Sequence, residues 1–238
     1  MSKCVKSKLA LVLSTVASLL LIVSVLFTAL QISINDRSWF EREYEKLNLT
    51  EKIGISVSDS TDAVMRLIDY MEGRVDTIEL TVHHYGEAVS MYNEREADHM
   101  IDVRNLYQAW RFVRTYGAIF GVILLLGAFL LTKKDFLVIL ARGFLYASAA
   151  FILLLVGIGL FAFIDFNAFW TAFHYLFFTN DLWLLNPLTD RMILICPERL
   201  FSDIVLRFAS RFVLCFALML AAAFFIKYRV KARYEHAR

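Results

Sequence analysis

Four long apolar segments constrain this chain of 238 residues more than any other feature of its sequence. They are Leu9–Ile32, Tyr116–Thr132, Phe144–Ile164 and Phe208–Ile226. A helix needs about 20 mostly apolar residues to cross the hydrocarbon of a bilayer, and each segment reaches or approaches that length. The sequence therefore predicts an all-α polytopic membrane protein with four transmembrane helices.

The first apolar segment follows Lys3, Lys6 and Lys8, which would suit the basic start of a signal peptide. The apolar run is too long for the core of a signal peptide, and no clean Ala-x-Ala cleavage site follows it. We therefore expect the segment to be retained as the first membrane span.

Composition excludes several other classes of protein. Hydrophobic residues make up 59% of the chain and charged residues 20%, with a net charge of only +2. No basic patch suited to nucleic acid is present. The three cysteines, Cys4, Cys196 and Cys215, show neither the spacing of a disulfide framework nor a C-x-x-C metal motif.

Lysine and arginine in the short flanks of the spans set the orientation in the membrane. Basic residues concentrate at the N-terminus, between the second and third spans, and at the C-terminus, which places both termini in the cytoplasm. The resulting segments are a cytoplasmic N-terminus with the first span (1–32), an extracytoplasmic domain (33–115), the second span (116–132), a cytoplasmic loop (133–143), the third span (144–164), an extracytoplasmic interfacial loop (165–206), the fourth span (207–226) and a cytoplasmic tail (227–238).

The extracytoplasmic domain is predicted to be small and of α+β type. Helical spacing of apolar residues starts at Ser58–Thr61 and ends at Gly73. Alternation predicts a strand at 78–82, and a turn leads to a second short strand at 88–91. Asn93, with a glutamate three residues later, can cap a helix that continues towards the second span.

The interfacial loop divides into an aromatic half and a polar half. Residues 166–178 are rich in Phe, Trp and Tyr, which favour the membrane–water interface, so we expect this stretch at headgroup depth. Residues 181–201 are polar and contain Trp183 and Asp190. A solvated loop and a surface that contacts substrate or lipid both fit this second half.

His99 is the first candidate catalytic residue. On a helix, Glu96, His99 and Asp102 lie three residues apart and can contact one another. A carboxylate in that position can orient the imidazole and raise its basicity. The same spacing also fits a capping glutamate followed by a packed core histidine.

His174 is the second candidate, in the aromatic half of the loop. It could be an amphipathic residue of the interfacial belt. Both histidines, however, are predicted on the outside and near the membrane surface, where the ester bonds of a lipid lie. Two imidazoles there can divide the roles of general base and oxyanion stabiliser.

Arg211 is predicted about one helical turn inside the fourth span. A charge at that depth usually faces a protein cavity or a partner. It could pair with a carboxylate of the outer loop or bind a lipid phosphate.

These residues occur in an ordered set: Glu96, His99, Met100, Asp102 and Val103, then Phe173, His174, Phe177 and Phe178, then Trp183, Asn186, Pro187 and Asp190, and finally Pro197, Glu198 and Phe201. With the four-span layout, this set resembles the lipoprotein intramolecular transacylase family, Lit, of Gram-positive bacteria. The resemblance covers nearly the whole chain.

The resemblance implies an O-to-N acyl transfer in the outer leaflet. The substrate would be a diacylated lipoprotein, and its sn-2 acyl chain would move to the α-amino group of its own N-terminal cysteine, giving a lyso-form lipoprotein. His99 is then expected to be the general base and His174 an acid or oxyanion stabiliser, with the two roles open to exchange. No cofactor and no metal are expected.

Two other functions remain open from the sequence. A metal-dependent membrane hydrolase could use Glu96, His99 and His174 as ligands, although no H-E-x-x-H motif is present. The chain could also be a non-catalytic membrane protein that binds lipid or peptide.

Overall fold

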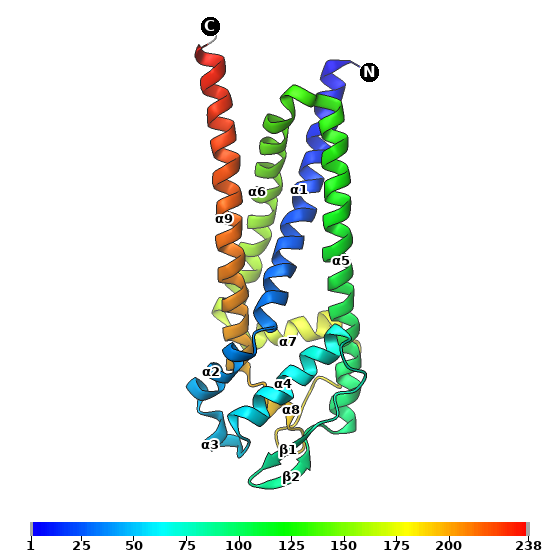
Figure 1. Cartoon of the computed structure of the whole chain (residues 1–238), viewed down its shortest axis with the longest axis vertical. Helices are drawn as coiled ribbons and strands as arrows, with labels where there is room; N and C mark the ends of the chain where they lie inside the picture. Colours follow the sequence, from blue (N-terminus) through cyan, green and yellow to red (C-terminus); the bar gives the residue numbers. More distant parts are fainter. Residues whose placement is uncertain (1, 237–238) are drawn as a thin grey trace. The chain divides into compact units, whose positions relative to one another are not determined.

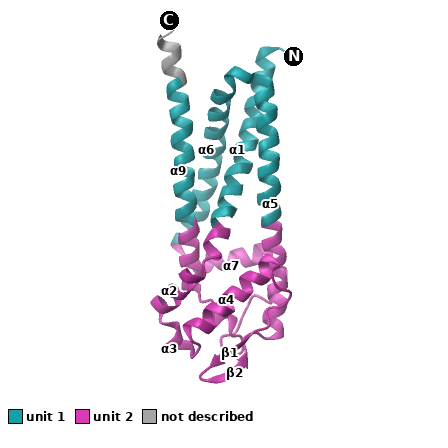
Figure 2. Ribbon diagram, in the orientation of Figure 1, with its two compact units in different colours: residues 1–29, 111–163, 209–238 teal, residues 30–110, 164–208 magenta. Residues whose placement is uncertain are grey.

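The computed structural model describes residues 2–236, and these form two compact units. The first unit, shown in teal in Figure 2, contains residues 1–29, 111–163 and 209–238. The second unit contains residues 30–110 and 164–208. Residues 237–238 of the predicted cytoplasmic tail lie outside the described part of the chain.

The first unit consists of long apolar helices. They belong to α1 (Lys3–Ile34), α5 (Glu94–Thr132), α6 (Phe136–Ile164) and α9 (Glu198–His236). Among the described residues, three continuous helical stretches are long and apolar enough to cross a membrane: Lys3–Ile34, Glu94–Ile164 and Glu198–Arg229. The chain is therefore a membrane protein built largely of helices.

The middle stretch is 71 residues long, far more than one crossing needs. It is divided by the 3-10 turn η1 (Lys133–Asp135), where Lys133 has a φ of 42° and the chain turns back on itself (Figure 1). Helix α6 begins at Phe136, before the expected start of the third span, because the apolar residues after the turn continue the helix directly.

Helix α1 packs against the other helices of its unit. Its Ile22 shares an apolar cluster with Phe144 of α6 and Phe212 of α9. Small residues bring α1 and α6 especially close: a Cβ atom added at Gly143 would lie 2.7 Å from the Cβ of Ser14 and 2.8 Å from its carbonyl carbon. Small residues at such crossings let helix backbones approach each other inside a membrane.

Gly143→Ala should therefore destabilise the first unit, by about 1–3 kcal/mol, because the new methyl group meets backbone atoms that cannot rotate away. The measurement is the unfolding temperature of the purified protein in detergent. Gly157→Ala in the same helix is the matched control, because nothing lies within 4 Å of its added Cβ and alanine favours the helix. Equal unfolding temperatures for the two variants would contradict the close packing of α1 and α6.

The second unit contains the shorter elements. They are α2 (Arg37–Leu47), α3 (Leu49–Ile53), α4 (Val57–Glu72), β1 (Thr81–His84), β2 (Glu87–Ser90), α7 (Phe166–Phe177) and α8 (Met192–Ile195). The start of α5 and the first residues of α9 also belong to this unit.

The helix and the hairpin predicted from the sequence are both present, but the first strand begins at Thr81 and not at residue 78. Helix α4 is capped by Ser56, whose hydroxyl accepts a hydrogen bond from the amide of Asp59, and it ends at Gly73 with a left-handed φ of 77°. Strands β1 and β2 pair antiparallel, with Val82 opposite Val89. Helices α2 and α3 were not expected, because α2 is rich in charged residues and α3 has only five residues.

The two outer segments share one hydrophobic core, although we expected a separate domain and loop. Phe40, Tyr44 and Met91 from the first segment pack in the same cluster as Ile195 and Leu200 from the second. The Tyr44 hydroxyl also donates a hydrogen bond to the carbonyl of Ile195, at 3.0 Å. This shared core allows functional side chains from both segments to meet.

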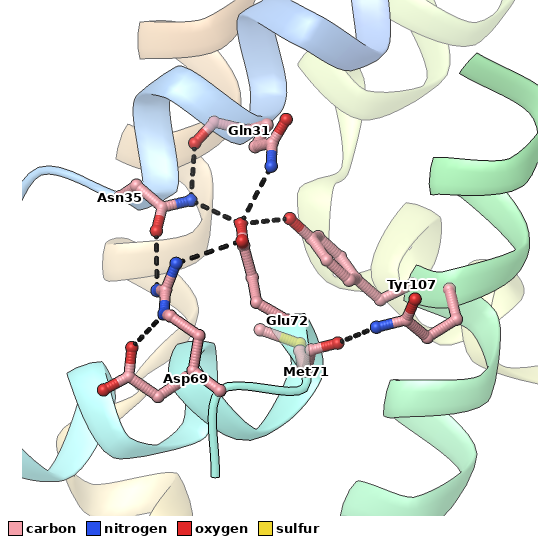
Figure 3. A network of polar contacts seen from close by, with 8 residues as sticks. Gln31, Asn35, Asp69, Met71, Glu72 and Tyr107 are labelled. Carbon is pink, nitrogen blue, oxygen red and sulfur yellow. Dashed lines mark hydrogen bonds and ion pairs between the residues drawn. The ribbon is translucent and has the colours of Figure 1, made fainter. Parts of the chain in front are cut away.

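The carboxylate of Glu72, which is mostly shielded from solvent, ties three helices of the second unit together (Figure 3). It accepts hydrogen bonds from Gln31 of α1 (3.1 Å), from Asn35 just after α1 (2.7 Å) and from Tyr107 of α5 (2.8 Å), and it pairs with Arg74. Burial alone would raise the pKa of Glu72, but these donors hold it below its usual value. The network fixes α5, the helix that carries His99, against the ends of α1 and α4.

Removing the Tyr107 hydroxyl by Tyr107→Phe should destabilise the protein by about 1–3 kcal/mol, because a carboxylate mostly shielded from solvent loses a donor. Thermal unfolding in detergent again provides the measurement. Tyr85→Phe is the control, since Tyr85 is 72% exposed. A Tyr107→Phe protein as stable as the control would show that the hydroxyl contributes nothing.

Candidate active site

The two candidate histidines lie in the same unit and face a common site. His99 is on the second turn of α5, and His174 is near the end of α7. Their ring centroids are 6.3 Å apart and each residue is only 7% exposed. Two residues separated by more than 70 positions in the sequence are thus brought within reach of one small group.

The orientation of the His174 ring is set by its own helix. Its Nδ1 lies 2.7 Å from the carbonyl oxygen of Trp170, one turn earlier in α7. A carbonyl can only accept, so Nδ1 must carry the hydrogen. In the neutral ring, Nε2 is then the unprotonated nitrogen, with its lone pair available as a base.

Aromatic side chains enclose both imidazoles. The His174 ring stacks on Trp183 at 4.8 Å and meets Trp170 edge-on at 4.9 Å. Phe178, which ends α7, packs 5.3 Å from the His99 ring and 5.5 Å from the His174 ring. The site is therefore a largely apolar enclosure, in which charge is poorly solvated.

Burial keeps both histidines neutral at physiological pH. It lowers the pKa of His99 to about 4, with a further lowering by His174 that the charge of Asp102 only partly offsets. Burial also lowers the pKa of His174, although the hydrogen bond to the Trp170 carbonyl acts in the opposite direction. The neutral imidazole is the form that accepts a proton in acyl transfer, and the imidazolium formed in this way donates the proton again.

Glu96 supports the site through the backbone. One carboxylate oxygen accepts from the amide of Asn93 at 2.8 Å, completing a capping box at the start of α5. The other accepts from the amide of Met192 at the start of α8. Burial raises the pKa of Glu96, and these two amides oppose that shift.

Asp102 and Asp190 also accept hydrogen bonds that stabilise the loop after α7, and they do not orient a histidine ring. Asp102 accepts a hydrogen bond from Asn180 at 2.8 Å. Asp190, 3% exposed, accepts from the side chain of Asn93 at 2.8 Å and from the amide of Asn186 at 2.6 Å. Nδ1 of His99 has no hydrogen-bond partner within the described part of the chain, so neither Glu96 nor Asp102 orients the ring through that atom.

The structure brings together His99, His174 and Trp183 from the set predicted by the sequence. Glu96, Asp102 and Asp190 surround them as supports, while Arg211 belongs to the first unit. The contributions of the Trp170 carbonyl and Asn180 were missed, and Phe178 was named only as part of the ordered set. The carbonyl gives no signal in a sequence, and the contact of Asn180 with Asp102 depends on tertiary structure.

Cys196 is unsuited to nucleophilic catalysis. It is fully enclosed, and burial, together with the nearby Glu96, raises the pKa of its thiol to about 12. A thiol must ionise to act as a nucleophile, so this one is inert near neutral pH. Among the residues that the structure describes, no three His, Cys, Asp or Glu side chains are grouped to hold a metal ion.

A model of the lipoprotein intramolecular transacylase family, Lit, matches residues 15–201. The chain belongs to this family. It is therefore a membrane enzyme that catalyses intramolecular acyl transfer on lipoproteins, as the resemblance in its sequence implied. No curated protein sequence matches the chain.

Solved structures of the Lit enzyme from Bacillus cereus share the fold. One superposes with a TM-score of 0.68 at 21% identity and covers 95% of this chain and 97% of the other. A variant of the same enzyme with a histidine replaced by arginine gives a TM-score of 0.62 at 20% identity, covering 94% and 93%. Another, with a histidine replaced by alanine, gives 0.62 at 22% identity, covering 94% of each chain.

The low pKa of His99 in this Lit-family chain can be measured directly by NMR titration of its imidazole in detergent or nanodiscs. We expect the resonance, assigned with His99→Ala, to keep its neutral position as pH falls through 6.5 and to move only near pH 4. The sign follows from burial, which disfavours the charged ring. A midpoint for His99 near 6.5, the ordinary pKa of an imidazole, would refute the buried, neutral assignment.

Proposed function

We propose that the enzyme moves the sn-2 acyl chain of a diacylglyceryl-cysteine lipoprotein to the α-amino group of that same cysteine. The single observation that carries the proposal is the pair of buried imidazoles, 6.3 Å apart in an apolar enclosure. Both rings are close enough to contact the same ester group, so they can share the proton transfers and charge stabilisation of an acyl transfer. The product is an N-acylated lyso-form lipoprotein.

The chemistry needs only the substrate and two neutral imidazoles. The α-amino group has a reference pKa of about 7.7–8.0, so part of it is already neutral near pH 7. Its nitrogen attacks the ester carbonyl carbon, and a base removes the proton that the nitrogen loses. The carbon–oxygen bond to the glycerol then breaks, and the leaving oxygen takes a proton as the amide forms.

We assign the base to His174, the reverse of the first expectation from the sequence. Its Nδ1–H is committed to the Trp170 carbonyl, which leaves Nε2 as a proton acceptor. His174 then returns the proton that it took from the amine to the leaving glyceryl oxygen, while the neutral His99 donates a hydrogen bond to the developing oxyanion. Amine and ester belong to one molecule, so their high effective concentration supplies much of the acceleration.

The proposed setting is the outer leaflet. Four membrane crossings with both termini in the cytoplasm follow from the basic flanks, and they place His99 and His174 outside. The exposed Leu176 and Leu188 beside the site suit contact with lipid. In this arrangement Trp183 contacts the substrate, Asp190 shapes its loop, and Arg211 binds a lipid phosphate.

Alanine at His99 or at His174 should slow formation of the lyso-form by about 100-fold or more, because general acid–base catalysis of this kind contributes about 10²–10⁴-fold. Purified enzyme is mixed with diacylated lipoprotein, and the N-terminal peptide is followed by mass spectrometry. His83→Ala on the exposed hairpin is the matched control. Wild-type rates for both site variants, with unfolding temperatures unchanged, would refute the proposal.

The same assay identifies the acyl chain that moves. A substrate with an isotope label only in its sn-2 chain should yield a product in which the label is on the amide. Mixing labelled and unlabelled lipoproteins of different peptide mass should give no crossed products. Label retained on the glycerol, or crossed products, would contradict an intramolecular sn-2 transfer.

A further inference from the structure

Two buried nitrogen atoms without a hydrogen-bond partner flank His174. Among the described residues, five buried side-chain nitrogen or oxygen atoms have no hydrogen-bond partner: Ser14 Oγ, Ser60 Oγ, His99 Nδ1, Ser148 Oγ and Trp183 Nε1. The two nitrogens belong to the two rings that flank His174. Leaving a buried donor unpaired is unfavourable by about 1–3 kcal/mol, so such atoms are expected where a bound ligand supplies the missing hydrogen-bond partner.

The indole nitrogen of Trp183 differs from the three serine hydroxyls. Each serine lies inside a helix, where its hydroxyl can rotate towards a carbonyl of the preceding turn. The indole N–H can only donate, and its direction is fixed by the ring. It therefore needs an acceptor from elsewhere.

The position of this donor is fixed by contacts with α5, the helix that carries His99. Arg95 of α5 donates a hydrogen bond to the carbonyl of Asp181, and Asp102 of α5 accepts one from Asn180. The indole itself stacks on His174 with an angle of 26° between the rings. This stacking holds the indole ring, which carries the N–H, beside the proposed base.

We propose that Nε1–H of Trp183 is a catalytic hydrogen-bond donor to the oxyanion of the tetrahedral intermediate. This assignment rests on the proposed acyl transfer. As the amine nitrogen bonds to the ester carbon, the carbonyl electron pair moves onto oxygen, and the indole stabilises that negative charge without giving up its proton. When the glyceryl oxygen leaves, the electron pair returns and the amide carbonyl forms.

The surroundings suit such a donor. In a water-poor apolar enclosure, a donor already in place stabilises developing charge without reorganising. His99 Nδ1, the other unpartnered nitrogen, provides a second donor in its protonated tautomer. Tyr175, 65% exposed, packs edge-on against the indole and is the neighbour with the most freedom to move as the ester enters.

The first test is Trp183→Phe, which keeps an aromatic ring against His174 but removes the N–H. We expect kcat for lyso-form production to fall by about 10²–10³-fold with KM changed little, because the lost bond forms mainly in the transition state. Trp39→Phe, elsewhere in the same unit, is the control for loss of an indole. A kcat within twofold of wild type overturns the assignment.

The second test does not depend on how the variant folds. Wild-type enzyme labelled with ¹⁵N-tryptophan is titrated with a phosphonate analogue of the sn-2 ester on a diacylglyceryl-cysteine peptide, and the indole resonance lost in Trp183→Phe is followed. We expect that N–H to move downfield on binding while the Trp39 resonance stays in place. An unmoved Trp183 resonance at saturation refutes the proposal.

The two proposals fail in different ways. Inactive His99→Ala and His174→Ala variants beside a fully active Trp183→Phe would overturn only the indole donor. Fully active histidine variants would overturn the acyl-transfer scheme itself.

Discussion

The buried carboxylate of Glu96 is the interaction on which the site depends. Its two oxygens accept backbone amides from Asn93 and Met192, which belong to outer segments far apart in the sequence. A carboxylate removed from water needs such donors, so the two segments satisfy it together. That requirement, with the shared hydrophobic core, holds the segment carrying His174 beside the helix carrying His99.

The enclosure formed in this way determines the chemistry available. Aromatic rings exclude water, and the same exclusion keeps both imidazoles uncharged. Uncharged rings can relay a proton between an amine and a leaving oxygen without an acyl-enzyme. The buried thiol of Cys196 lies close to Glu96, yet its raised pKa leaves it outside that chemistry.

The sequence was sufficient for the long apolar helices, for α4 and the hairpin, and for choosing His99 and His174 as candidates, because apolar length, alternation and capping patterns are local. It predicted Glu96 as a possible partner of His99, since both lie on one helical face. The structure instead directs the carboxylate to backbone amides, one of them 96 positions away. Tertiary packing also determines helices α2 and α3, the common core and the contact of Asp102 with Asn180. These features therefore could not be predicted from the sequence.

The partner that orients His174 is a main-chain carbonyl in its own helix. No single substitution can delete a main-chain carbonyl, so His174 keeps this hydrogen-bond acceptor as long as α7 stays helical. Residue 170 is then free to vary in side chain without changing the tautomer of the histidine one turn later. A proline within α7, which would distort the turn, is the kind of change that evolution should avoid there.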